Sequence, residues 1–155
     1  MDNDLELEKI GIEADEEIPY SIIENYIFEI QGLSANKKLF LLMLRKYAGA
    51  KQNPAFPSYS TLMKDIGSNS TATIMKCIDF FIWLHWIERI QRQKEGSKEK
   101  ISNWYLLSLK NIRIVLEHFN KNNYSFTEIE KYFESEYKKS DTRKDFLAKP
   151  CKYLL

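Results

Sequence analysis

The chain has 155 residues, of which 44% are hydrophobic and 14% aromatic, with only five glycines and four prolines. This composition is typical of a folded, helix-rich protein and excludes a disordered or collagen-like chain. No apolar run approaches the roughly 18 to 20 residues that span a bilayer, and no secretory signal begins the chain, so a cytoplasmic protein whose two cysteines are free thiols is predicted.

The net charge of +1 conceals an uneven distribution along the chain. Residues 1–17 hold eight acids and one base, a net charge of −7, which leaves the remaining residues with +8. We interpret residues 1–17 as a flexible tail, because they show no amphipathic stripe. A basic body behind an acidic tail is a common arrangement in nucleic-acid-binding proteins, and a solvated tail without a role is the alternative.

Two helices are predicted before residue 50. Apolar residues recur every three or four positions over residues 18–30, which indicates an amphipathic helix that ends at Gly32. Ser34 then caps a helix that runs to about Ala48. Its centre, residues 39–44, is apolar on all sides, so we expect this helix to be buried on more than one face.

Two further helices are predicted to meet at a tight turn. Ser58 is a suitable N-cap for a helix over residues 59–66. Gly67 gives the backbone the freedom that a tight turn requires. Ser70 then caps a second helix that extends to about Leu84.

The second of these helices changes character along its length. Its first half is amphipathic and presents small polar residues outward, whereas residues 80–84 are apolar all round. The outward side chains of Phe80 and Trp83 therefore need cover, which either another part of the chain or a second subunit can provide.

A β-hairpin follows the second helix. Residues 86–93 and 101–109 have the character of strands, and Gly96 lies in the turn between them. Residues 89–100 contain five bases and two acids. A basic hairpin tip can lie against phosphates. The alternative is an ordinary hydrated turn, in which lysine is common.

The rest of the chain is predicted to be helical. An apolar stripe runs from Ile112 to Phe119, and a capping box at residues 125–128 starts the next helix. Asp141 is the expected cap of a last short helix before Pro150. The predicted fold is mainly α with a small β-hairpin wing, divided into a tail (1–17), a winged helix-turn-helix domain (18–110) and a C-terminal helical extension (111–155).

The central third of the chain resembles the winged-helix domains of phage and plasmid replication proteins, a group that includes the DnaD-like primosome proteins. The residues that carry the resemblance are Pro57-Ser58, Leu62, Ile66-Gly67, Ser70, Thr73-Ile74, Ile78, Phe81, Trp86-Ile87 and Asn103-Trp104-Tyr105. The sequence departs from the family pattern in two places: the turn before Ser70 has one extra residue, and His85 stands where the family has glycine. The pattern is more specific for the fold than for the biological role.

The resemblance implies that the second helix of the pair is a recognition helix, which enters the major groove N-terminus first. The candidate DNA contacts are Asn69, Ser70, Thr71, Thr73 and Lys76 on this helix and Arg89, Arg92, Lys94, Lys98 and Lys100 on the hairpin. The helix has no arginine, the side chain that makes the commonest specific guanine contact. Binding would therefore depend on phosphates and on the hairpin, and would weaken strongly with salt.

The leading hypothesis is a sequence-specific binder of double-stranded DNA, a replication initiator or accessory replication protein of a plasmid, phage or other mobile element. A homodimer reading two half-sites is expected, with a helicase or its loader as a further partner. A transcriptional regulator with the same module and a replisome protein-interaction module with weak DNA binding are the alternatives. Lys76→Glu should abolish DNA binding under the leading hypothesis and leave assembly unchanged under the last.

No enzymatic activity, metal or cofactor is expected. The chain has two histidines, no CxxC or HxxxH pattern and no phosphate-binding GxxxxGK[ST] loop. The acidic tail suggests one more hypothesis: it folds back on the basic wing and competes with DNA, so that deleting residues 1–17 tightens binding at low salt.

Overall fold

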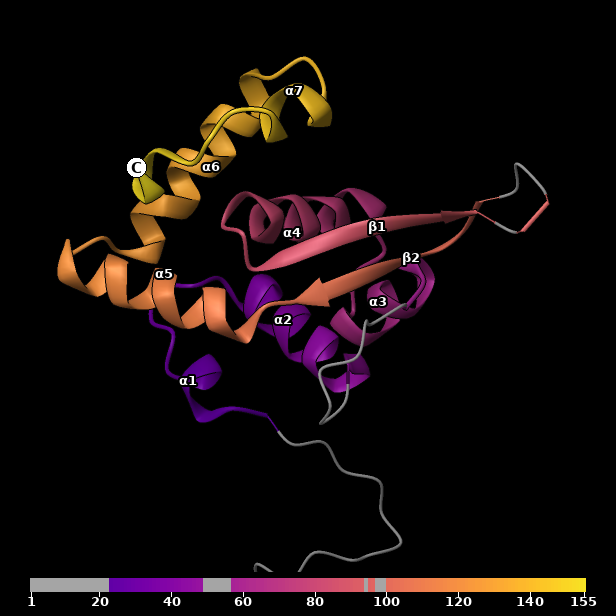
Figure 1. The fold of residues 1–155 in the computed structure, drawn as a ribbon, viewed down its shortest axis with the longest axis horizontal. Coiled ribbons are helices and arrows are strands. Elements are labelled where there is room, and N and C mark those ends of the chain that lie inside the picture. The colour runs from indigo at the N-terminus through magenta and orange to yellow at the C-terminus, as the bar shows by residue number, and fades with distance from the viewer. Residues whose placement is uncertain (1–22, 49–56, 94, 97–99) are drawn as a thin grey trace, which may run out of the picture.

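A computed structural model describes residues 23–48, 57–93, 95–96 and 100–155, with the backbone alone at 91–93 and 100–102. Its elements are α1 (Asn25–Phe28), α2 (Ala35–Ala48), α3 (Tyr59–Ile66), α4 (Thr71–Trp83), β1 (Ile87–Gln93), β2 (Lys100–Leu107), α5 (Leu109–Lys121), α6 (Phe126–Lys139), α7 (Arg143–Leu147) and the 3-10 turn η1 (Lys152–Leu154). This order confirms the predicted fold class, mainly α with a two-stranded wing (Figure 1). The predicted tail lies outside the described residues.

The helix pair α3–α4 forms as its capping residues predict. The hydroxyl of Ser58 accepts a hydrogen bond from the backbone N–H of Thr61 at 3.2 Å, and that of Ser70 accepts from Thr73 at 3.4 Å. Gly67 has a φ of 75°, the left-handed conformation that glycine adopts without steric cost. These local interactions fix both ends of the turn between α3 and α4.

The hairpin is a two-stranded antiparallel sheet in which Ile87 pairs with Leu107 and Arg89 with Tyr105. A register shift between Ile90 and Arg92 marks a bulge in the wing. The return strand ends before the predicted limit of residue 109. Ser108 accepts a hydrogen bond from the N–H of Asn111 at 3.1 Å and so starts α5 at that point.

Two other sequence predictions are wrong. The helix predicted over residues 18–30 is a single turn, α1, within the part that the structure describes. Its β-branched isoleucines and Asn25 are weak helix formers, and one turn gains little from its own hydrogen bonds. The cap of α7 is Thr142 and not Asp141, because the Thr142 hydroxyl is the group that accepts a hydrogen bond from the N–H of Asp145, at 3.0 Å.

One hydrophobic core joins the winged part of the chain, which consists of α2, α3, α4 and the β1–β2 hairpin, to the C-terminal helices. Phe81 of α4 stacks between Phe40 of α2 and Trp86, with ring centroids 5.8 and 5.5 Å apart. The same cluster of buried side chains includes Phe133 of α6 and Phe146 of α7. The helix α4 consequently lies between α2 on one side and α6 and α7 on the other (Figure 1).

Candidate nucleic-acid interface

The first turn of α4 is open to solvent. Asn69, Ser70 and Thr71 are exposed, and Thr73 is partly buried. The Ser70 hydroxyl is used as the helix cap, whereas the side chains of Asn69 and Thr71 have no hydrogen-bond partner among the described residues. The turn therefore offers an amide, hydroxyl groups and the free N–H groups of a helix start, all of which can contact base edges or phosphate oxygens.

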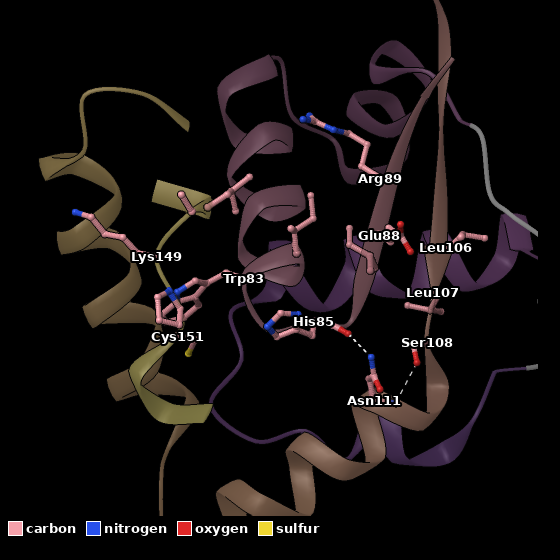
Figure 2. A pocket seen from close by; sticks show the side chains of 15 residues that line it. Trp83, His85, Glu88, Arg89, Leu106, Leu107, Ser108, Asn111, Lys149 and Cys151 are labelled. Carbon is pink, nitrogen blue, oxygen red and sulfur yellow. Dashed lines mark hydrogen bonds between the residues drawn. The ribbon is translucent and has the colours of Figure 1, made fainter. Parts of the chain in front are cut away.

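The hairpin contributes Arg89 to a groove of about 720 Å³ beside α4. This groove is lined by the C-terminal end of α4, by β1 and β2, and by residues 147–151. Arg89 lies on one side of it and Lys149 on the other (Figure 2). Neither cation has an ion-pair partner among the described residues. The side chains of the other predicted hairpin contacts, Arg92, Lys94, Lys98 and Lys100, lie outside the described residues.

Lys76, the remaining predicted contact, has a partner within the chain. Its ammonium group lies 3.0 Å from a carboxylate oxygen of Glu134 on α6. The two side chains are 43% and 46% exposed. The structure therefore places Lys76 close to the exposed first turn but not free of a counter-charge.

One helical turn beyond Lys76, the outward face of α4 carries a buried carboxylate. Asp79 has no exposed surface and accepts hydrogen bonds from Arg143 at 2.6 and 2.8 Å and from the Tyr137 hydroxyl at 2.7 Å. Burial and the bond to Asp79 raise the pKa of Tyr137, and the same carboxylate raises the pKa of Arg143. The three side chains fasten the end of α6 and the start of α7 to α4.

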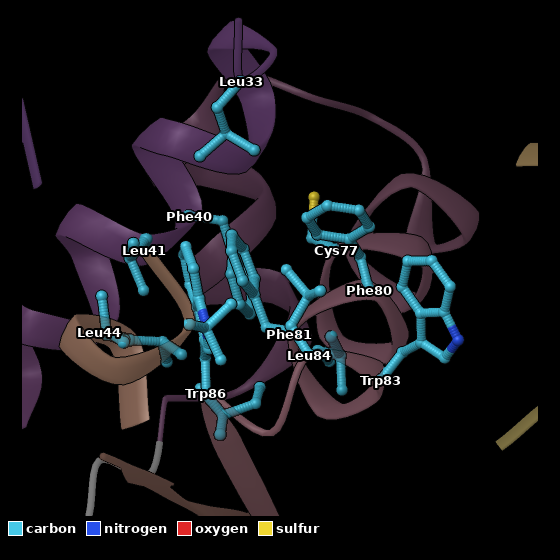
Figure 3. Close-up of a cluster of buried hydrophobic side chains, with 14 of the residues drawn as sticks. Leu33, Phe40, Leu41, Leu44, Cys77, Phe80, Phe81, Trp83, Leu84 and Trp86 are labelled. Carbon is cyan, nitrogen blue, oxygen red and sulfur yellow. The ribbon is translucent and has the colours of Figure 1, made fainter. Parts of the chain in front are cut away.

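The last turns of α4 are covered by aromatic side chains. Trp83 lies 6.1 Å from Tyr132, 5.6 Å from Phe133 and 6.0 Å from Phe146 between ring centroids, and Phe80 lies 5.1 Å from Phe133. Figure 3 shows Trp83 on the side of α4 that faces away from Phe40 and Phe81, whereas Phe80 also meets Phe81 edge-on, with ring centroids 5.3 Å apart. The sequence left open whether another part of the chain or a second subunit covers Phe80 and Trp83. In the structure, another part of the chain covers them.

Sequence reasoning did not identify Glu134 or the Asp79–Arg143–Tyr137 contact. One signal was present: Asp79 is an acid among the apolar residues of the second half of α4, and a buried acid requires a partner. The identity of that partner was not available from spacing, because Arg143 is 64 residues away.

Comparison with known families agrees with this arrangement. A family model described as a helix-turn-helix domain matches residues 31–79. This part of the chain is therefore similar to a helix-turn-helix domain. The matched segment holds α2, α3 and α4 as far as Asp79, so the exposed first turn belongs to the second helix of the α3–α4 pair, and such a domain indicates binding to DNA.

The other comparisons and searches add no further site. Neither the curated proteins nor the solved structures gave a match. Among the described residues, no three His, Cys, Asp or Glu side chains are grouped so that they could hold a metal ion. In that same part of the chain, every helix is too short or too polar to cross a membrane.

Proposed function

We propose that the protein binds duplex DNA at a specific site through the first turn of α4 and the β1–β2 hairpin. The observation that carries this proposal is the exposed polar turn, residues 69–73, at the start of the second helix of a helix-turn-helix domain. We further propose that it acts in the cytoplasm, without enzymatic activity, as an initiator or accessory protein in the replication of a plasmid, phage or other mobile element. The resemblance of residues 57–105 to replication proteins supports this role.

The arrangement favours insertion of the N-terminal end of α4 into the major groove. Residues 69–73 can reach base edges, whereas the last turns of the helix are occupied by α6 and α7. Arg89 and the basic residues of the hairpin would neutralise phosphates, with release of the counterions that surround the duplex. In a homodimer, two such helix ends would read two half-sites separated by about one turn of DNA.

A charge placed at the first residue of α4 tests this interface. In Thr71→Glu, the carboxylate suits the helix dipole, so the fold should be kept, but it opposes the DNA phosphates. Ala35→Glu is the matched control, because Ala35 is also the exposed first residue of a helix, α2. Fluorescence anisotropy with duplexes from the gene's own neighbourhood should show at least about tenfold weaker binding for Thr71→Glu alone. Equal affinities of the two variants would overturn the proposal.

A protein-interaction module is the second candidate, and large apolar side chains that are exposed favour it. They include Phe28 at 53%, Ile114 at 51% and Leu155 at 84%, whereas Trp83 is covered within the chain. Sedimentation velocity with and without DNA separates the two candidates. Self-association combined with weak binding to every duplex would favour the interaction module. Footprinting at an origin or at a promoter would then separate replication from transcription.

A further inference from the structure

We propose that Glu134 of α6 withholds Lys76 from DNA and thereby limits the affinity of the recognition helix for the duplex. This inference rests on the proposed DNA-binding function. It adds a determinant of affinity outside the helix-turn-helix domain, since Glu134 lies 55 residues beyond the end of the matched segment at residue 79.

Lys76 is the cation that the recognition helix itself can offer to a phosphate. The sequence of α4 contains no other lysine and no arginine. Lys76 follows the exposed first turn directly, which is where a side chain meets the backbone of a duplex that the helix end enters. Its ammonium group is instead bound to the Glu134 carboxylate at 3.0 Å.

The position of Glu134 is fixed by its neighbours on α6. Phe133, the preceding residue, packs edge-on against Phe80 of α4, with ring centroids 5.1 Å apart. Tyr137, about one turn later, donates its hydrogen bond to Asp79 of α4. The backbone of α6 at Glu134 therefore cannot move away from α4 without the loss of buried contacts on both sides of it.

Glu134 also interrupts a basic stripe on α6. Lys131 and Lys138, three residues before and four residues after it, share its face of the helix and are exposed. Neither lysine has an ion-pair partner among the described residues. A phosphate that approaches Lys76 must displace the Glu134 carboxylate and then remain close to it. Removal of this one charge would leave Lys131 and Lys138 near Lys76, and the other acid of this face, Glu130, lies 3.1 Å from the ammonium group of Lys37.

The test compares two neutralising substitutions on α6 in the full-length protein. Glu134→Gln frees Lys76. Glu136→Gln removes the same charge two residues away, from a glutamate that faces Lys139 of α6 at 3.6 Å. Lys76→Gln in both the wild-type and the Glu134→Gln background completes the comparison. Thermal melting of each variant checks that it is folded.

Binding to a duplex is measured over a series of salt concentrations. Glu134→Gln should bind roughly three- to tenfold more tightly at low salt, and its plot of log K against log salt should be steeper by about 0.9, the value for one added phosphate contact. Lys76→Gln should cancel this gain in the Glu134→Gln background and change wild-type affinity less than twofold.

The outcomes separate this inference from the function on which it rests. Wild-type binding with equal affinities for Glu134→Gln and Glu136→Gln would overturn the role of Glu134 and leave DNA binding in place. A large loss of affinity in Lys76→Gln alone would also overturn it, because Lys76 would then already contact DNA. A failure of every variant to bind duplex would overturn the proposed function together with the inference.

Discussion

At the residue scale, Asp79 determines how α4 is attached to the C-terminal helices. Its carboxylate is completely buried and receives three hydrogen bonds from Arg143 and Tyr137. The desolvation of such a pair costs free energy, and its hydrogen bonds offset that cost only when both partners are present. The contact therefore specifies where α7 docks more than it adds net stability.

Arg143→Ala tests this attachment. It leaves the Asp79 carboxylate buried without its counter-charge, and we expect a loss of about 3 kcal/mol in the free energy of unfolding, measured with urea. This value is at the low end for a buried pair because the Arg143 side chain is 28% exposed. Lys144→Ala, at the exposed next residue, should change stability by less than about 0.5 kcal/mol. Equal stability of the two variants would contradict a structural role for the pair.

His85 is a second residue whose conformation can be tested. It has a φ of 60°, the left-handed region that favours glycine, and it is exposed. We expect His85→Gly to stabilise the protein by about 0.5 to 1 kcal/mol, since the relief of backbone strain exceeds the added entropy of the unfolded chain. Asn123→Gly, at a φ of 56°, should gain less, because asparagine tolerates this region better. A lower thermal midpoint for His85→Gly would refute the assignment of strain.

At the scale of elements, one polar contact links α2 to α3. The Tyr47 hydroxyl donates a hydrogen bond to the Asp65 carboxylate, and this bond raises the pKa of Tyr47 to about 12. The contact joins the end of α2 to the last turn of α3. It therefore helps to set the position from which the turn and α4 begin.

Tyr47→Phe should cost about 1 kcal/mol in the free energy of unfolding, because it removes the hydrogen bond and keeps the ring. Tyr124→Phe is the control, since the Tyr124 hydroxyl has no hydrogen-bond partner among the described residues. Denaturant titration followed by tryptophan fluorescence measures both variants. Identical midpoints would show that the Tyr47–Asp65 bond makes no net contribution.

The elements that the sequence predicted well are those with local start and stop signals. The helices α3 and α4 begin after Ser58 and Ser70 as expected, because a serine hydroxyl and a left-handed glycine act within a few residues of one another. The apolar periodicity of residues 18–30 was misleading over the described part, residues 23–30, because Ile27 and Ile30 are buried there without a long helix. The cover over α4 and the Glu134–Lys76 pair were not predictable, since they depend on tertiary contacts between distant segments.

At the scale of the whole molecule, buried thiols and phenols make stability depend on pH in alkaline solution. Burial raises the pKa of Cys77 and Cys151 to about 11, from 9.0, and that of Tyr105 to about 12, from 10.0. The unfolded chain therefore loses these protons at lower pH than the folded protein does. Between about pH 7 and pH 8.5 these groups should leave stability unchanged, and stability should fall as the pH rises towards 11.

Thermal melting between pH 7 and pH 11 checks this dependence. We expect the midpoint to decline above pH 9 and the decline to be shallower in Cys151→Ala, which lacks one of the titrating groups. The native thiols should also react very slowly at pH 8, because the thiolate is the reactive form. A midpoint that is independent of pH up to 10.5, or rapid labelling of the native protein, would contradict the burial of these thiols.

The last prediction concerns whether the winged part can exist without the C-terminal helices. A chain that ends at residue 125 would expose Phe80 and Trp83 and would leave Asp79 without Arg143 and Tyr137. Because these losses combine apolar exposure with an unpaired buried charge, we expect aggregation or the loss of a cooperative melt in circular dichroism. Removal of Leu155 alone, a residue that is 84% exposed, should leave the melt unchanged. A soluble, cooperatively melting fragment would instead show that α6 and α7 are a removable cover, and that fragment should then bind duplex more tightly than the full chain.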